Sequence, residues 1–152
     1  MKKFAPLILF LIYLNVSAQN TVQSEVQKTI EAFFFGFHAK DSSLIKKAVS
    51  ENVIIQTIGR AKDGSGILMT EDFGEFLRSI ESIPDSVDFK EHLLSIKIQV
   101  DGAMANAWTP YEFWHNWSFS HCGVNSFQLF KDKGEWKIIY LIDTRRKEGC
   151  DH

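Results

Sequence analysis

The sequence has no large excess of charge of either sign, since 17 Lys and Arg stand against 19 Asp and Glu. A nucleic-acid-binding protein neutralises phosphates with a basic surface, so nucleic acid is not the expected partner. The sequence also lacks internal repeats, low-complexity tracts and linkers, which for 152 residues indicates one domain. Its hydrophobic content of 45% excludes wholesale disorder.

No apolar run is long enough to cross a bilayer as a permanent helix. The longest run, residues 7–14, follows Lys2 and Lys3 and precedes the small residues 16–18, which predicts a signal peptide over residues 1–18. The residue directly after the expected cleavage point is not a Cys, so a lipoprotein anchor is not expected. We therefore expect an exported protein, periplasmic or secreted, with one domain over residues 21–150 and no membrane contact after cleavage.

Helical periodicity is found in three segments. Apolar residues recur at helical spacing along residues 22–40, and Asp41 can cap a second, shorter helix. Residues 53–58 predict a strand, and residues 59–66 have the composition of a loop. Thr70 can cap a third helix, which Pro84 ends.

From residue 94 onward the apolar period is two, which is typical of strands. The pattern predicts strands over residues 94–100, 103–117, 120–131 and 136–146. Asp101-Gly102 and Lys133-Gly134 are hairpin signals, and Pro110 predicts a bulge or an edge position. The fold class is therefore α+β, with helices packed on an antiparallel sheet.

Both faces of these strands are apolar, and the helices can cover only one of them. A second copy of the chain is the economical cover for the other face, so we expect a homodimer through the exposed sheet face. A two-residue turn at Lys133-Gly134 would place Gln128 on the face of Asp143, with His121 and Asn125 on the opposite face. A three-residue turn would change which residues share a face.

Aromatic and polar residues are most concentrated over residues 108–122. Aromatic walls with a few polar groups suit a planar ligand such as a pteridine or a flavin-like ring. Glu112 could accept hydrogen bonds from ring N–H groups, and Asn125 or Gln128 could both donate and accept. Alternatively, the Trp side chains pack the sheet edge and Glu112 lies in solvent. The candidate ligand-binding residues are Trp108, Tyr111, Glu112, His121, Asn125, Gln128 and Asp143.

A metal site is not expected, because the His residues show no HxH or HxxxH spacing. No cofactor is expected either. Cys122 and Cys150 are the only cysteines; they either form a disulfide, as export would allow, or are unrelated thiols. His121 cannot easily activate Cys122, because neighbours in a strand point to opposite faces. The basic residues 145–147 could bind an anion or form a solvated strand end.

Several segments resemble the nuclear transport factor 2-like superfamily. At the N-terminal side these are residues 33–35, 39–41, Leu44 and 52–53. Residues 108–113, 120–124, 127–129 and 134–138 resemble its lumazine-binding branch. The resemblance covers residues 22–150 and implies a cystatin-like cone, in which a strongly curved sheet wraps around three helices. It does not imply one function, since the superfamily contains isomerases, dehydratases, cyclases and non-catalytic binders.

The ketosteroid isomerase mechanism of that superfamily is not supported by this sequence. Those relatives place a carboxylate base on the first strand and a phenol on the first helix. Here residues 53–58 contain no carboxylate, and the first helix has Phe33 and Phe34 in place of a Tyr. The leading hypothesis is a binder of a small, partly aromatic molecule. The alternatives are a lyase or isomerase that uses Asp143, Glu112 or His121, and an interaction module that dimerises through the sheet.

Overall fold

The computed structural model describes residues 5–150, with side chains from residue 21 onward. The helices are α1 (Ala5–His38), α2 (Ser42–Ala48) and α3 (Phe73–Glu81). The strands are β1 (Val49–Arg60), β2 (Gly66–Glu71), β3 (Phe89–Leu93), β4 (Lys97–Asp101), β5 (Met104–His115), β6 (Ser118–Asp132) and β7 (Glu135–Arg146). The expected signal peptide, residues 1–18, lies outside the described side chains. None of the described helices is long and apolar enough to cross a membrane.

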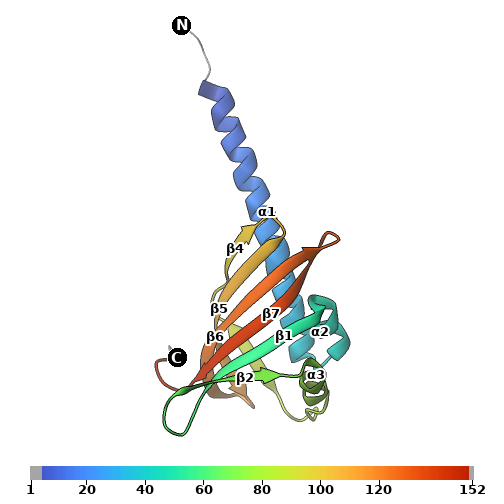
Figure 1. Cartoon of the computed structure of the whole chain (residues 1–152), viewed down its shortest axis with the longest axis vertical. Coiled ribbons are helices and arrows are strands. Elements are labelled where there is room, and N and C mark those ends of the chain that lie inside the picture. Colours follow the sequence, from blue (N-terminus) through green and yellow to red (C-terminus); the bar gives the residue numbers. More distant parts are fainter. Residues whose placement is uncertain (1–4, 151–152) are drawn as a thin grey trace.

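The seven strands form one curved sheet in the order β2-β1-β7-β6-β5-β3, and β4 also pairs with β5. Helix α1 crosses one face of the sheet, while α2 and α3 lie near β1 and β2 (Figure 1). The expected α+β architecture is confirmed, with one correction: β1 and β7 are parallel, so the sheet is mixed and not wholly antiparallel. These two strands come from opposite ends of the domain. The segment that connects them is most of the domain, so no tight turn forces the two strands to be antiparallel.

The starts of the two shorter helices follow from their capping residues. Asp41 caps α2 as expected, since its carboxylate accepts hydrogen bonds from the backbone N–H groups of Ser43 and Leu44 at 2.8 and 3.1 Å. The cap of α3 is Asp72, which accepts from Glu75 N at 2.8 Å, and not Thr70 as expected. Thr70 belongs to β2, a strand that the sequence analysis missed, and accepts a hydrogen bond from Gln56 on β1.

The second missed strand is β3, which pairs with β5 from Phe89↔His115 to Leu93↔Tyr111. Pro110 lies inside β5, where its carbonyl oxygen accepts from Leu94 N at 2.8 Å, between the segments that pair with β3 and β4. The N–H that proline lacks would point to the same side as its carbonyl, towards the irregular residues 94–96. Of the two predicted alternatives, a bulge or an edge position, Pro110 therefore takes a position without a strand partner on that side. The bulge in β5 lies between Phe113 and Trp114.

A bulge in β7 changes which residues share a face of the sheet. The β6–β7 hairpin has the two-residue turn Lys133-Gly134. Gln128 then pairs with Tyr140 and Leu129 with Ile138, so Ile139 has no partner on β6 in this register. One extra residue shifts the side-chain alternation by one position. As a result, Asn125 lies opposite Asp143 on the same face, which corrects the arrangement predicted for an unbroken ladder.

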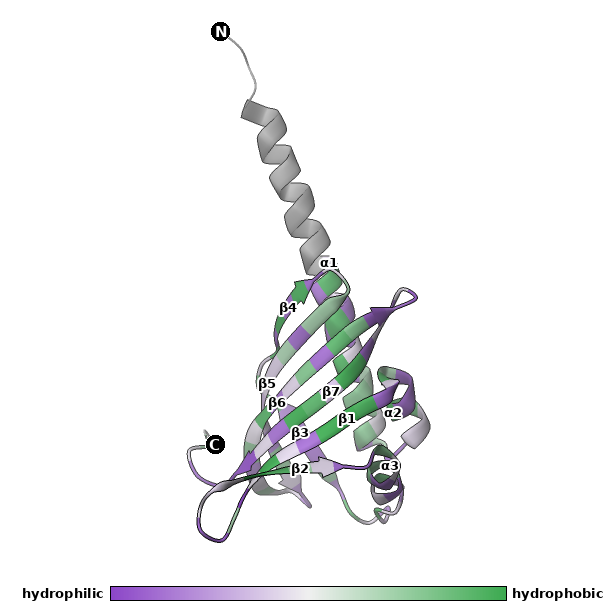
Figure 2. Ribbon diagram, in the orientation of Figure 1, coloured by the Kyte–Doolittle hydropathy of each residue, from purple (hydrophilic) through white to green (hydrophobic). Residues whose placement is uncertain are grey.

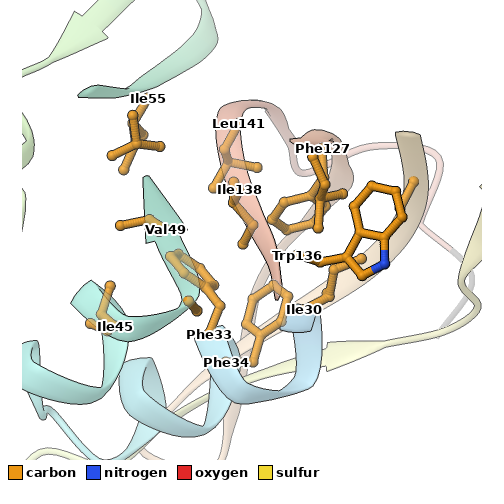
Figure 3. Close-up of a cluster of buried hydrophobic side chains, with 14 of the residues drawn as sticks. Ile30, Phe33, Phe34, Ile45, Val49, Ile55, Phe127, Trp136, Ile138 and Leu141 are labelled. Atoms are coloured by element: carbon orange, nitrogen blue, oxygen red, sulfur yellow. The ribbon is translucent and has the colours of Figure 1, made fainter. Parts of the chain in front are cut away.

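The hydrophobic core lies between the inner face of the sheet and the helices (Figure 3). Ile30 and Phe33 of α1 pack with Phe127, Ile138 and the other buried side chains of the strands. Gly36 of α1 allows close approach of α2, because an added Cβ would lie 2.8 Å from Ile45 N. Burial of these apolar side chains fixes the helices on one face of the sheet.

The outer face of the sheet is also partly apolar (Figure 2). Its exposed large side chains include those of Ile54, Trp108 and Phe130, with exposed fractions of 49%, 52% and 46%. No described helix covers this face. The expectation that a second copy covers it stays a prediction.

Cys122 and Cys150 are joined by a disulfide, with Cα atoms 5.9 Å apart. Cys122 lies on β6 opposite Arg146, not opposite Arg145 as an unbroken ladder would place it. Arg146 also donates hydrogen bonds to the carbonyl oxygens of Glu148 and Gly149. The segment after β7 is therefore attached to the end of the sheet at two points.

Candidate functional site

A cavity of about 280 Å³ lies between the inner face of the sheet and helices α1 and α3. One side of it is an aromatic wall, whose members are Phe33, Phe34, Phe37, Phe76 and Phe113. Phe33 and Phe37 stack at 6.4 Å between ring centroids, and Phe37 stacks on Phe76 at 6.2 Å. The helical spacing of these Phe residues on α1 and α3 therefore builds both the core and the wall of the cavity.

The polar side of the cavity comes from the strands. Its members are Glu71 on β2, Glu91 on β3, Tyr111 on β5, His121 and Asn125 on β6, and Asp143 and Arg145 on β7. Asp143 and Arg145 share this face with Asn125 because of the bulge at Ile139. Residues Asp143 and Arg145 are two apart on one strand and therefore point to the same face.

Asp143 is the centre of a hydrogen-bond network. Its Oδ1 accepts from Thr57 Oγ1 at 2.5 Å, and its Oδ2 accepts from Arg145 Nε at 2.9 Å. The Tyr111 hydroxyl lies 3.2 Å from Asp143 Oδ2 and 3.0 Å from the carbonyl oxygen of Thr144, and it can donate to either. The guanidinium and the hydroxyls around this buried carboxylate offset the cost of removing it from water.

Tyr111 is 2% exposed, and its ring lies over β6 at Gly123. A Cβ at this position would overlap the carbonyl oxygen of Thr144 and lie 2.8 Å from the Tyr111 ring. Burial, together with the charges of Asp143 and Glu91, raises the pKa of the Tyr111 phenol. The phenol is therefore a hydrogen-bond donor at neutral pH, and Gly123 provides the space that it needs.

Glu91 is held differently from Asp143, although both line the same cavity. Its Oε1 accepts from Asn125 Nδ2 at 2.6 Å, and a neutral amide does not compensate the charge of a carboxylate. Burial raises the pKa of Glu91 from 4.5 to about 7, and the negative charge of Asp143 adds to the shift. Three carboxyl groups therefore line the cavity: that of Asp143 is ion-paired, burial raises the pKa of Glu71, and that of Glu91 can exchange a proton near neutral pH.

Two histidines lie near these carboxyl groups. His38 Nε2 accepts from the backbone N–H of Glu91 at 3.0 Å, and burial lowers the pKa of His38 to about 4. His121 stacks on Phe113 with ring centroids 4.9 Å apart, and burial and Arg145 lower its pKa. Both imidazoles are therefore neutral at pH 7, and His121 offers a neutral polar edge to the cavity.

The structure brings together four of the seven candidate residues: Tyr111, His121, Asn125 and Asp143. The other three, Trp108, Glu112 and Gln128, alternate with the inward-facing residues and do not line the cavity. Trp108 is exposed, and Glu112 accepts a hydrogen bond from Trp114 Nε1 at 3.2 Å. Their outward position differs from the prediction, which had all seven residues line one pocket.

Glu91 was missed because its strand was missed. Its neighbours at two-residue spacing, Phe89 and Leu93, are apolar and point inward with it. A Glu in the middle of such an alternation is the signal that could have found it. Among the described residues, no group of three His, Cys, Asp or Glu side chains is placed to hold a metal ion.

No protein-family model and no curated protein sequence matches this chain. Solved structures do match it. A nuclear transport factor 2-like protein with a cystatin-like fold from Novosphingobium aromaticivorans is 13% identical, with a TM-score of 0.65 over 99% of this chain and 94% of the other. A Streptomyces avermitilis protein, provisionally named a dehydratase of that family, is 13% identical, with a TM-score of 0.64 over 84% and 98%.

A third match is a Shewanella frigidimarina protein provisionally named a ketosteroid isomerase. It is 12% identical to this chain, with a TM-score of 0.59 over 78% of this chain and 94% of the other. The structural similarity establishes the fold. Because the sequence identities are this low, the activity has to be argued from the site. The chain thus has the cystatin-like α+β fold of nuclear transport factor 2-like proteins.

Proposed function

We propose that this protein binds a small organic molecule in the cavity between the sheet and helices α1 and α3. The observation that carries the proposal is the division of one cavity into a wall of Phe side chains and a cluster of polar groups. The Phe wall suits an apolar or aromatic body, and the polar cluster can orient it. Its volume of about 280 Å³ favours one or two rings, such as a pteridine, over a flavin.

A thermal-shift screen of the protein with pteridines, flavins, steroids and simple one- and two-ring aromatics tests this proposal. A ligand should raise the unfolding temperature, because it binds only the folded state. Ser79 of α3 lines the cavity, so Ser79→Phe should abolish the shift by filling it. Arg78→Phe, on the same helix but outside the lining, is the matched control and should keep the shift. A shift that survives Ser79→Phe would place the ligand elsewhere.

Proton transfer on the bound molecule is a second candidate, favoured by the contrast between Glu91 and Asp143. Glu91 could take a proton from a C–H beside a carbonyl group and return it to another atom of the ligand. The Arg145 guanidinium, which is 57% exposed, could stabilise the negative oxygen that forms in between. Glu91 thus replaces Glu112 among the acid/base candidates.

Amide variants separate a binder from an enzyme. For an isomerase or lyase, Glu91→Gln should abolish turnover of a ligand found in the screen while the affinity changes little. For a binder, wild type and Glu91→Gln should both show no turnover. Glu112→Gln is the matched control, because Glu112 does not line the cavity.

We also propose that the protein acts outside the cytoplasm. The predicted signal peptide and the disulfide both support this location, since disulfides persist in oxidising compartments. N-terminal sequencing of the protein from its native cells should find a chain that begins at Gln19. A start at Met1 would contradict the proposal.

A further inference from the structure

A second hollow, of about 830 Å³, adjoins the cavity at the end of the sheet. We call it the basic groove. Its walls are the end of β1, residues 64–66, the end of β7 and the segment after it. His121 and Arg145 line both the cavity and the basic groove, so the two hollows adjoin at these side chains.

Four cationic side chains line this groove, from segments far apart in the sequence: Arg60, Arg145, Arg146 and Lys147. Among the described residues that line it, Glu148 is the only acidic one. The whole chain has a formal net charge of −2, so this concentration of positive charge is local. Cations that converge in this way repel one another, and an anion between them would remove that repulsion.

The arrangement differs from a solvated strand end, because the structure holds the basic residues in place. The Cys122–Cys150 disulfide and the hydrogen bonds from Arg146 to Glu148 and Gly149 fix the segment that carries Lys147. On the opposite wall, Ala61 N donates to Ser65 O at 2.8 Å and closes the loop that follows Arg60. Arg145 is anchored by Asp143 through Nε, and more than half of its side chain is exposed.

We infer that the basic groove binds an anionic group of the ligand, a carboxylate or a phosphate, while the apolar body of the same molecule occupies the cavity. This inference rests on the proposed binding function and narrows the ligand to an amphiphilic anion. Guanidinium groups match the planar, bidentate geometry of carboxylates and phosphates, and Lys147 adds a point charge. His121, which lines both compartments, is neutral and does not oppose an anion.

The test uses three probes with the same two-ring body: 2-naphthylacetate, its uncharged amide 2-naphthylacetamide, and 2-naphthyl phosphate. Binding is followed by two-dimensional NMR of backbone amides in the oxidised protein. The acid or the phosphate should bind about tenfold more tightly than the amide, as expected for charge-assisted hydrogen bonds. The amides of Gly59 and Lys147 should shift with the charged probes only. The tighter of the two charged probes identifies the anion.

Charge-removing variants provide the control. Arg60→Gln/Lys147→Gln should bring the affinity of the charged probes close to that of the amide. Lys28→Gln/Lys46→Gln removes the same charge from α1 and α2, outside the groove lining, and should leave the preference unchanged. Loss of the preference in both double variants would show a general charge effect and overturn the inference.

The remaining outcomes distinguish the two proposals. Equal affinity for the acid, the phosphate and the amide would overturn the anion inference and leave the proposed cavity function standing. If none of the three binds, the proposed function fails for two-ring ligands, and inorganic phosphate alone then tests the groove. Phosphate shifts at Gly59 and Lys147 would support an anion site, and no shift would refute it.

Discussion

Replacing Glu91 with Gln tests the description of the site most directly, because it removes one ionisable group and keeps the shape of the side chain. The pKa of Glu91 is raised from 4.5 to about 7, chiefly by burial. Between these two pH values the folded state holds a proton that the unfolded chain releases. The free energy of unfolding therefore falls as the pH rises through this window, and the stabilisation is fully lost above pH 7.

The magnitude follows from the size of the shift. A difference of one pKa unit corresponds to about 1.4 kcal/mol, so the shift of Glu91 corresponds to about 3 kcal/mol. The side-chain amide that Glu91→Gln introduces is neutral at every pH, and its oxygen can still accept from Asn125. Relative to wild type, Glu91→Gln should therefore gain about 3 kcal/mol of stability between pH 4 and pH 8.

Urea unfolding of both proteins at several pH values between 4 and 8 measures this difference. Taking the difference cancels the titration of groups that the two proteins share. Glu112→Gln is the matched control, and its stability relative to wild type should stay within about 0.5 kcal/mol across the range. A pH-independent difference between wild type and Glu91→Gln would refute the conclusion that burial holds this carboxyl protonated.

Three further predictions concern the surroundings of the site. Gly123→Ala should cost about 3 kcal/mol in urea unfolding, because the new methyl group would overlap the Thr144 carbonyl oxygen; a loss below about 1 kcal/mol would contradict the close approach. Cys150→Ser should lower the free energy of unfolding by about 3 kcal/mol, since it opens a loop of 28 residues, and no change would contradict this. Sedimentation should show a dimer for the wild type and a monomer for Phe130→Glu on the outer face; a monomeric wild type would refute dimerisation.

The parts of the fold that depend on neighbouring residues could be predicted from the sequence. Asp41 caps α2 because its side chain reaches the N–H groups two and three residues later. The turn Lys133-Gly134 was predicted because a Gly at positive φ is needed there, and Gly134 has φ of 92°. Such features involve few residues, so a local pattern is enough to find them.

The parts that depend on a distant partner could not be predicted. Thr70 is an acceptable helix cap by itself, but pairing of its segment with β1 makes it a strand residue. The alternation around Glu91 indicates a strand, but the pairing of β3 with β5 decides that its side chain points into the cavity. In both cases the deciding contact joins residues that are well separated in the chain.

By itself, the sequence determined the α+β class, two apolar faces on the strands and apolar stripes on the helices. These follow from composition and from periods of 3.6 and 2, which the chain carries in any environment. The tertiary structure alone decided which polar groups meet. The unpaired Ile139 moves Asp143 to the face of Asn125, because side chains alternate with a period of two and one extra residue reverses the alternation. That one residue brings Asp143 and Arg145 to the polar side of the cavity.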